Sequence, residues 1–192
     1  TVSVGVHEMG QGIRTALANA VGRKLGIDPA KVDAVIGDTR GAPQHLTAGS
    51  WGTATAVPAA EQAAEKLLVE LGPNPQSAIA KQGLDSYEVR IERRAPGQPA
   101  QLAEALHSGR PAPWGPIYGE FISYSYIAHF VEVRVEPTTR RIRVARVVSV
   151  ADCGRVISPR TAESQVKGGV VWGIGAALRE ATEVDPRYGG FL

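Results

Sequence analysis

The sequence predicts an α+β fold in which mixed β-strands pack against helices. Three observations support this prediction. Two segments of alternating hydrophobicity, 2–7 and 31–38, are each followed by a glycine-containing loop and an amphipathic helix. Two further alternating segments are separated by a short turn within 127–152, which indicates a β-hairpin. A long helix follows the hairpin, so strands and helices are mixed along the chain.

The first strand–helix unit is defined by its apolar spacing. Within 2–7, alternate positions are filled by Val2, Val4 and Val6, as in a half-buried strand. A helix is expected over about 12–25, because apolar residues recur every four positions: Ile13, Leu17, Val21 and Leu25. Gly26 is suited to end this helix in the left-handed conformation.

The second unit repeats this order and is followed by an irregular middle. A strand at 31–38 leads through a loop of small and turn residues to a helix at about 54–71. Seven prolines then fall within 72–116, which predicts an irregular insertion or a lid. A short strand at 87–92 and a short helix at 100–106 are the elements expected there.

Residues 117–192 are expected to form a hairpin and a glycine-rich helix. One face of the second hairpin strand carries four apolar side chains, Ile142, Val144, Val148 and Val150. Ser158 is placed to cap the helix, and Pro159 suits its first position. The helix is expected to run to about residue 182.

The composition limits the classes of function. The 192 residues carry a net charge of +2, which is too small to favour nucleic acid or an anionic membrane as a partner. No apolar run approaches the roughly 20 residues of a membrane-spanning helix. Cys153 is the single cysteine, which excludes an internal disulfide, and we expect it to be a buried small hydrophobe.

The start of the first helix is a candidate binding feature. Gly10 and Gly12 flank Gln11, where they would leave backbone N–H groups free at the positive end of the helix dipole. Such a terminus accepts an anion, and a glutamine amide suits the edge of a heterocycle. Turn geometry alone is the alternative explanation for the glycines. We expect Glu8 to be a partner of the helix dipole rather than a catalytic base.

A second glycine loop, TAGSWGT, precedes the next helix and repeats this arrangement with hydroxyls at Ser50, Thr53 and Thr55. Neither loop matches the dinucleotide fingerprint or the P-loop, which disfavours a nicotinamide cofactor or ATP.

The last helix contains an unusual number of glycines. Each interior glycine costs about 1 kcal/mol relative to alanine, and this helix holds Gly168, Gly169, Gly173 and Gly175. Close packing of another helix backbone, or of a flat ligand, would account for them. Gln165 lies one turn before the first of these glycines.

Three segments in this order carry a family resemblance: EMGQGIRT, LTAGSWGT and VVSVADCGRVISPRTAESQVKGGVVWGIGAAL. They resemble the molybdenum-binding large subunit of the xanthine dehydrogenase/aldehyde oxidase family, and within it the isoquinoline 1-oxidoreductase-like branch. The resemblance covers about 1–71 and 118–192. It implies that residues 1–192 are a single cofactor-binding domain, most of the second molybdopterin-binding domain, truncated at both ends.

The resemblance also implies a cofactor and the residues that hold it. The cofactor would be molybdopterin with molybdenum, in bacteria usually in its cytosine dinucleotide form. The family's glutamine between glycines reaches the pterin–phosphate region, its second glycine loop meets the metal's ligands and the phosphate end, and a later glutamine bonds the pterin. The matching positions here are Gly10, Gln11, Gly12, Gly49, Ser50, Thr53 and Gln165.

By the same resemblance, the intact subunit would hydroxylate N-heteroaromatic compounds or aldehydes with oxygen derived from water. Electrons would pass to an iron–sulfur small subunit, with or without a flavin subunit. The family's general-base glutamate is expected beyond Leu192, so no catalytic residue and no metal ligand is assigned here, and the chain alone is expected to be inactive. The compartment stays open between bacterial cytoplasm and periplasm. A non-catalytic α+β binding or interaction module is the alternative.

Overall fold

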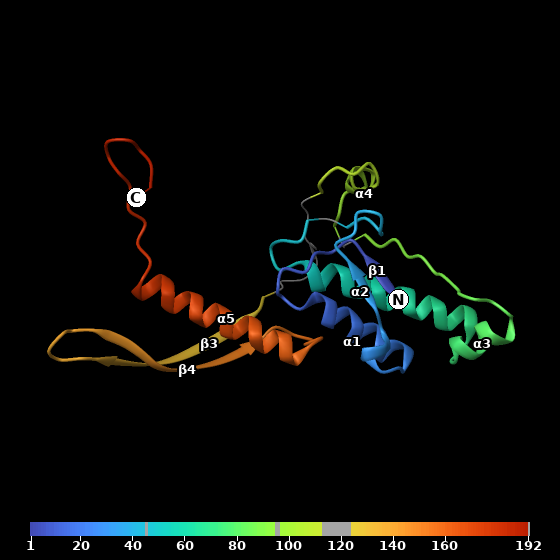
Figure 1. The fold of residues 1–192 in the computed structure, drawn as a ribbon, viewed down its shortest axis with the longest axis horizontal. Helices are drawn as coiled ribbons and strands as arrows, with labels where there is room; N and C mark the ends of the chain where they lie inside the picture. Colours follow the sequence, from blue (N-terminus) through green and yellow to red (C-terminus); the bar gives the residue numbers. More distant parts are fainter. Residues whose placement is uncertain (45, 95–96, 113–123, 192) are drawn as a thin grey trace. The chain divides into compact units, whose positions relative to one another are not determined.

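The computed structural model describes residues 1–44, 46–94, 97–112 and 124–191. The chain forms two compact units, Thr1–Ser123 and Tyr124–Leu192. Figure 1 shows the elements of each unit along the chain.

The first unit begins with a parallel strand pair joined by a helix. Strand β1 (Val2–Val4) pairs with β2 (Ala34–Ile36), and the helix α1 (Ile13–Leu25) with the short 3-10 helix η1 (Pro29–Lys31) connects them. The strands are shorter than the sequence predicts. The Gly37 N–H nevertheless donates to the Val6 carbonyl at 2.9 Å, so the pairing continues past their ends.

Helix α2 (Gly52–Leu71) packs along α1 and closes the core of the first unit (Figure 1). Ile13 and Leu17, from the predicted apolar stripe of α1, and Val57 of α2 are at most 1% exposed in this core. Gly26 ends α1 with a φ of 66°, as its position predicts. This βα-βα arrangement fixes the two glycine loops, because each lies between a β-strand and the helix that follows it.

The middle of the chain differs from the sequence prediction. The predicted helix forms as α4 (Ala100–His107), and a further helix, α3 (Pro75–Lys81), forms in addition. The predicted strand at 87–92 is wrong, since this segment is irregular and pairs with no strand of the described residues. It is tied to α2 by a side-chain bond instead, from the Tyr87 hydroxyl to Glu70 Oε2 at 2.9 Å. Residues 113–116 lie outside the described part.

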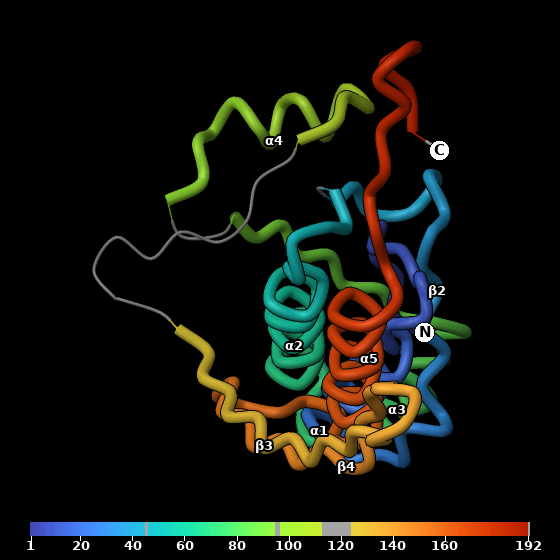
Figure 2. The backbone as a smooth tube through the Cα atoms, turned by 90° about the vertical axis from the view of Figure 1, so that its left-hand side faces the viewer, coloured from blue at the N-terminus to red at the C-terminus, as the bar shows by residue number. Residues whose placement is uncertain are grey.

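The second unit contains the predicted hairpin and helix. Strand β3 (Tyr126–Val135) pairs antiparallel with β4 (Ile142–Asp152), with a register shift between Glu132 and Val133, and the two strands run side by side in Figure 2. Helix α5 (Pro159–Leu178) contacts β4. Pro159 takes the first helical turn as expected, but the side chain of Ser158 makes no capping bond, and the helix ends at 178 rather than 182.

Large apolar side chains of the second unit are exposed. Phe130 on β3 is 67% exposed and Trp172 on α5 is 75% exposed. The expectation that Cys153 is buried is wrong, because it follows the end of β4 and is exposed. In the described ranges, the helices lack the combination of length and hydropathy that a bilayer span requires.

Candidate functional site

The first glycine loop (residues 7–12) is organised by the Glu8 carboxylate. Glu8 Oε1 accepts the N–H groups of Gly10 and Gly12, both at 2.9 Å. Glu8 Oε2 accepts the Arg14 N–H at 3.1 Å. The expectation that these glycines leave free N–H groups for an anion is therefore wrong, because an internal carboxylate already occupies the start of α1. The expectation that Glu8 is the dipole partner of this helix is confirmed.

The environment of Glu8 lowers its pKa. Partial burial of the carboxyl raises the pKa, but hydrogen bonds from the N–H groups of Gly12, Arg14 and Gly10 lower it, as does the charge of Arg14, and the net pKa lies below the ordinary value. The carboxylate is thus ionised at neutral pH, in the form that the three N–H donors require.

The Gln11 side chain folds back onto its own loop. Its Oε1 accepts the Met9 N–H at 2.6 Å, and its Nε2 donates to the His7 carbonyl at 2.7 Å. A primary amide has two donor hydrogens and two acceptor lone pairs. One of each therefore stays available for a ligand, and the amide is held in a fixed orientation.

The backbone of this loop needs its glycines. Gly10 and Gly12 have φ values of 94° and 85°, which L side chains rarely adopt. A Cβ built on Gly10 would meet no atom within 4 Å, so this glycine is required by backbone geometry and not by packing in the described structure. The turn explanation is correct for both glycines, and open space above Gly10 also leaves room for a ligand.

The second glycine loop (residues 46–52) is more strained. Gly49 has a φ of 58° and Ser50, which is not a glycine, has a φ of 61°. The Trp51 ring covers Gly49 so closely that a Cβ there would lie 2.7 Å from Trp51 Cε2. Backbone conformation and packing therefore both require a glycine at this position.

The start of α2 differs from the start of α1. Neither helix has an acidic residue in its first turn or a side-chain bond from its N-cap residue, but α1 has Glu8 from the preceding loop. The side chains of Ser50 and Thr53 are exposed at the start of α2. The Thr55 hydroxyl is used internally, since it donates to the Trp51 carbonyl and accepts from Gln44 Nε2, both at 2.8 Å. Among the described residues, no carboxylate bonds the N–H groups of Gly52, Thr53 or Ala54 in the way that Glu8 bonds the start of α1.

The two glycine loops lie against each other. The His7 N–H donates to Thr47 Oγ1 at 3.0 Å, and His7 Nδ1 lies 3.1 Å from the same hydroxyl. A Cβ on Gly52 would also lie 3.6 Å from Val6 Cγ2. Parallel pairing places the carboxyl ends of β1 and β2 at one edge of the sheet, where ligands of α/β folds bind. Sequence reasoning missed Thr47, because nothing in its neighbourhood marks a contact forty residues away.

The third segment predicted to contact the cofactor, around Gln165, lies in the second unit. Gln165 is exposed on α5. A Cβ on Gly168, Gly169 or Gly173 would meet no atom within 4 Å, so close helix packing does not explain these glycines within this unit. The contact of Gln165 with the cofactor stays a prediction, as do the roles assigned to the residues of the two loops.

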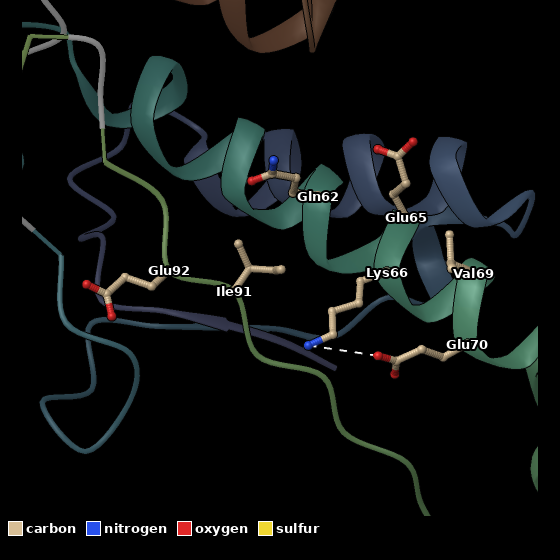
Figure 3. A pocket seen from close by; sticks show the side chains of 7 residues that line it. All are labelled: Gln62, Glu65, Lys66, Val69, Glu70, Ile91 and Glu92. Atoms are coloured by element: carbon tan, nitrogen blue, oxygen red, sulfur yellow. Dashed lines mark ion pairs between the residues drawn. The ribbon is translucent and has the colours of Figure 1, made fainter.

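An open hollow on α2 is separate from these loops. Figure 3 shows Lys66 and Glu70 on the helix, paired at 3.9 Å, and Ile91 and Glu92 on the irregular segment that also lines the hollow. Since a helix rises about 1.5 Å per residue, Lys66 lies about 20 Å along α2 from the second glycine loop. The hollow is open and most of its charged side chains are paired, so the candidate site is confined to the two glycine loops. Over the described ranges, His, Cys, Asp and Glu form no group of three or more that could hold a metal ion.

Two glycine loops at the carboxyl edge of a parallel strand pair, each opening a helix, form the candidate ligand site of this α+β unit. Over residues 1–192 the sequence matches the family described as molybdopterin cofactor-binding domain. The chain belongs to this family. The resemblance to the molybdenum-binding large subunits and the α+β fold class are thereby confirmed.

Individual relatives agree with this assignment. The chain is 31% identical to the aldehyde oxidoreductase molybdenum-binding subunit PaoC of Escherichia coli, over 100% of this chain and 26% of that protein. It is 30% identical to the nicotine 6-hydroxylase large subunit of Paenarthrobacter nicotinovorans, over 96% of this chain and 25% of that protein. The solved Cu,Mo-CO dehydrogenase superposes with a TM-score of 0.67 at 27% identity, over 99% of this chain and 26% of that one. The chain thus spans about a quarter of the length of these relatives.

Proposed function

We propose that this chain binds part of a molybdopterin cofactor in the molybdenum-binding subunit of a hydroxylase. The family match over residues 1–192 is the observation that carries this proposal. The two adjoining glycine loops supply the place where such a cofactor meets the first unit. When bound, the cofactor supplies the redox chemistry of hydroxylation, whereas the residues of this chain bind and orient it.

The two loops would hold different parts of the cofactor. The start of α2, with Ser50 and Thr53 exposed and no acidic residue in its first turn, suits the phosphate end. The Gln11 amide, with one donor and one acceptor unused, suits the polar edge of the pterin. Gly49 would present backbone near the metal's ligands, and Gln165 would bond the pterin from the second unit. Residues 1–192 would then act as one cofactor-binding domain although they form two compact units.

The finer activity is inferred from the family resemblance and from two named relatives. One relative is named for the oxidation of aldehydes and another for the hydroxylation of nicotine. For this protein we propose hydroxylation of an N-heteroaromatic compound or an aldehyde with oxygen derived from water, in the isoquinoline 1-oxidoreductase-like branch. An iron–sulfur subunit would accept the electrons, and the 192-residue chain by itself would be inactive.

The test is the cofactor content of protein produced in a bacterial host that makes molybdopterin. Molybdenum is measured by mass spectrometry, the pterin by the fluorescence of its oxidised product, and the nucleotide by release of CMP on hydrolysis. We expect all three in equal amounts. Pterin without CMP would remove the cytosine dinucleotide form from the proposal. Protein free of both pterin and molybdenum would favour the non-catalytic interaction module instead.

A further inference from the structure

The starts of α1 and α2 are chemically different although the sequence makes them look alike. Each helix opens from a glycine loop, and each loop contains residues with positive φ. At α1, however, a carboxylate four residues before Gly12 accepts three backbone N–H groups. At α2 no acidic residue lies in the first turn. Within the described part of the chain, a carboxylate accepts the N–H groups at the start of α1 and none accepts those of residues 52–54 at the start of α2.

The same carboxylate also fixes the shape of the first loop. Glu8 Oε1 bridges Gly10 and Gly12, the two residues on either side of Gln11. With both flanking N–H groups held, the Gln11 amide can reach the Met9 N–H and the His7 carbonyl in one conformation. The orientation of the unused donor and acceptor on Gln11 is therefore set by Glu8, which itself need not touch a ligand.

We propose that Glu8 is a positioning residue that fills the start of α1, so that the first glycine loop receives an uncharged edge of the cofactor and excludes its phosphate. This inference rests on the proposed function for the identity of the ligand. In the chain without a ligand, Glu8 already holds the loop in its binding conformation, and the N–H groups bonded to Glu8 do not bind anions.

Two variants and one control separate the parts of this proposal. Glu8→Ala removes both acceptor oxygens, and Glu8→Gln keeps one acceptor oxygen but removes the charge. Asp28→Ala is the matched control, since Asp28 is also exposed and accepts one backbone N–H, from Ala30 at 2.9 Å, in the same unit.

The first measurement is amide hydrogen exchange by NMR on the 192-residue chain. The Gly12 and Arg14 amides should exchange about fivefold faster in Glu8→Ala than in the wild type, which is the usual effect of losing a helix cap. Glu8→Gln should lie between the two, and Asp28→Ala should leave both amides unchanged. Equal exchange in the wild type and Glu8→Ala would overturn the proposal.

The second measurement is a titration of the same proteins with inorganic phosphate. The Gly10 and Gly12 amide resonances should shift in Glu8→Ala and stay in place in the wild type, because an exposed helix start attracts phosphate. Shifts of equal size in the wild type would show that Glu8 does not exclude anions and would overturn the proposal.

The third measurement is the molybdenum and pterin content of wild type and variants purified from a molybdopterin-producing host. We expect about tenfold less of both in Glu8→Ala, an intermediate content in Glu8→Gln, and wild-type content in Asp28→Ala. Equal contents in the wild type and Glu8→Ala would overturn the positioning role. A wild type without cofactor would refute the proposed function, and the exchange and phosphate measurements would still decide whether Glu8 organises and closes the loop.

Discussion

Thr47 holds His7 through two contacts to one hydroxyl, at 3.0 Å from the His7 main-chain nitrogen and 3.1 Å from His7 Nδ1. His7 begins the first glycine loop and Thr47 lies within the second. Through this pair the two loops form one surface, although forty residues separate them.

Replacement of Thr47 by valine should loosen this surface. Thr47→Val keeps the shape of the side chain but removes the hydroxyl, and the His7 N–H then depends on water. We expect a loss of about 0.5–1.5 kcal/mol in the free energy of unfolding, measured by urea denaturation of the chain. Thr47→Ser keeps the hydroxyl and is the control. If the serine variant loses as much stability as the valine variant, the hydroxyl is not what joins the loops.

Gly49 should tolerate alanine worse than Gly10 does. Both residues have positive φ, so alanine is strained at either position, at a cost of about 1–2 kcal/mol. At Gly49 the added Cβ also meets the Trp51 ring, whereas at Gly10 it meets open space. We therefore expect Gly49→Ala to cost about 1 kcal/mol more than Gly10→Ala, by urea denaturation followed by circular dichroism.

A double variant separates the two contributions at Gly49. In the background Trp51→Ala, the Gly49→Ala change should cost only about as much as Gly10→Ala does in the wild type, because the ring is gone. A cost in that background as large as in the wild type would assign the whole effect to backbone strain.

We expect the folded protein to lose stability in acid because of Glu8. A carboxyl whose pKa is lowered by folding contributes stability above its unfolded pKa, and this contribution is lost as the pH falls through the folded pKa. The charge that acts on Glu8 is that of Arg14. A comparison with Glu8→Gln, which cannot ionise at this position, isolates the contribution of the Glu8 carboxyl.

The measurement compares the wild type with Glu8→Gln from about pH 6 to about pH 3. The free energy of unfolding of the wild type should exceed that of Glu8→Gln at pH 6, and the difference should shrink as the pH falls below about 4.5. A difference that stays constant down to pH 3 would mean that ionisation of Glu8 does not stabilise the loop.

Gln11→Ala should lower cofactor retention. The variant removes the amide that is proposed to contact the pterin, together with its two hydrogen bonds to the loop. A buried polar group of the cofactor is then left unpaired, which costs about 1–3 kcal/mol of binding free energy. Molybdenum and pterin content after purification measure the effect. Gln62→Ala, on the exposed face of α2, is the control and should retain the wild-type content. Unchanged content in Gln11→Ala would remove Gln11 from the site.

The elements predicted correctly are those with strong local patterns. Apolar spacing of 3.6 residues gave α1 and α2, and clean alternation on both sides of a turn gave the β3–β4 hairpin. The predicted strand at 87–92 was wrong, because a strand needs a partner and its sequence does not say whether one is near. Helix α3 carried a signal that was overlooked: Asn74 Oδ1 accepts the Ser77 N–H at 3.3 Å, and Pro75 follows it at the first helical turn.

The sequence predicts the two loops of the candidate site but not the contacts within them. The positive φ values of the glycines follow from their local sequence, so the loops themselves could be identified. Glu8 could be predicted as a partner of the α1 dipole, but its three hydrogen bonds could not, because it reaches these N–H groups from outside the usual capping positions. Cys153 was misjudged because burial depends on what covers the end of β4, which a hydrophobic pattern does not specify.

The carboxylate at the start of α1 also makes ligand binding at the two loops depend differently on salt. Dissolved ions screen attraction between a charged ligand group and a helix dipole, and they have little effect on hydrogen bonds between neutral amides and a heterocycle. We therefore expect rising ionic strength to weaken binding at the loop before α2 and to leave the loop before α1 almost unaffected.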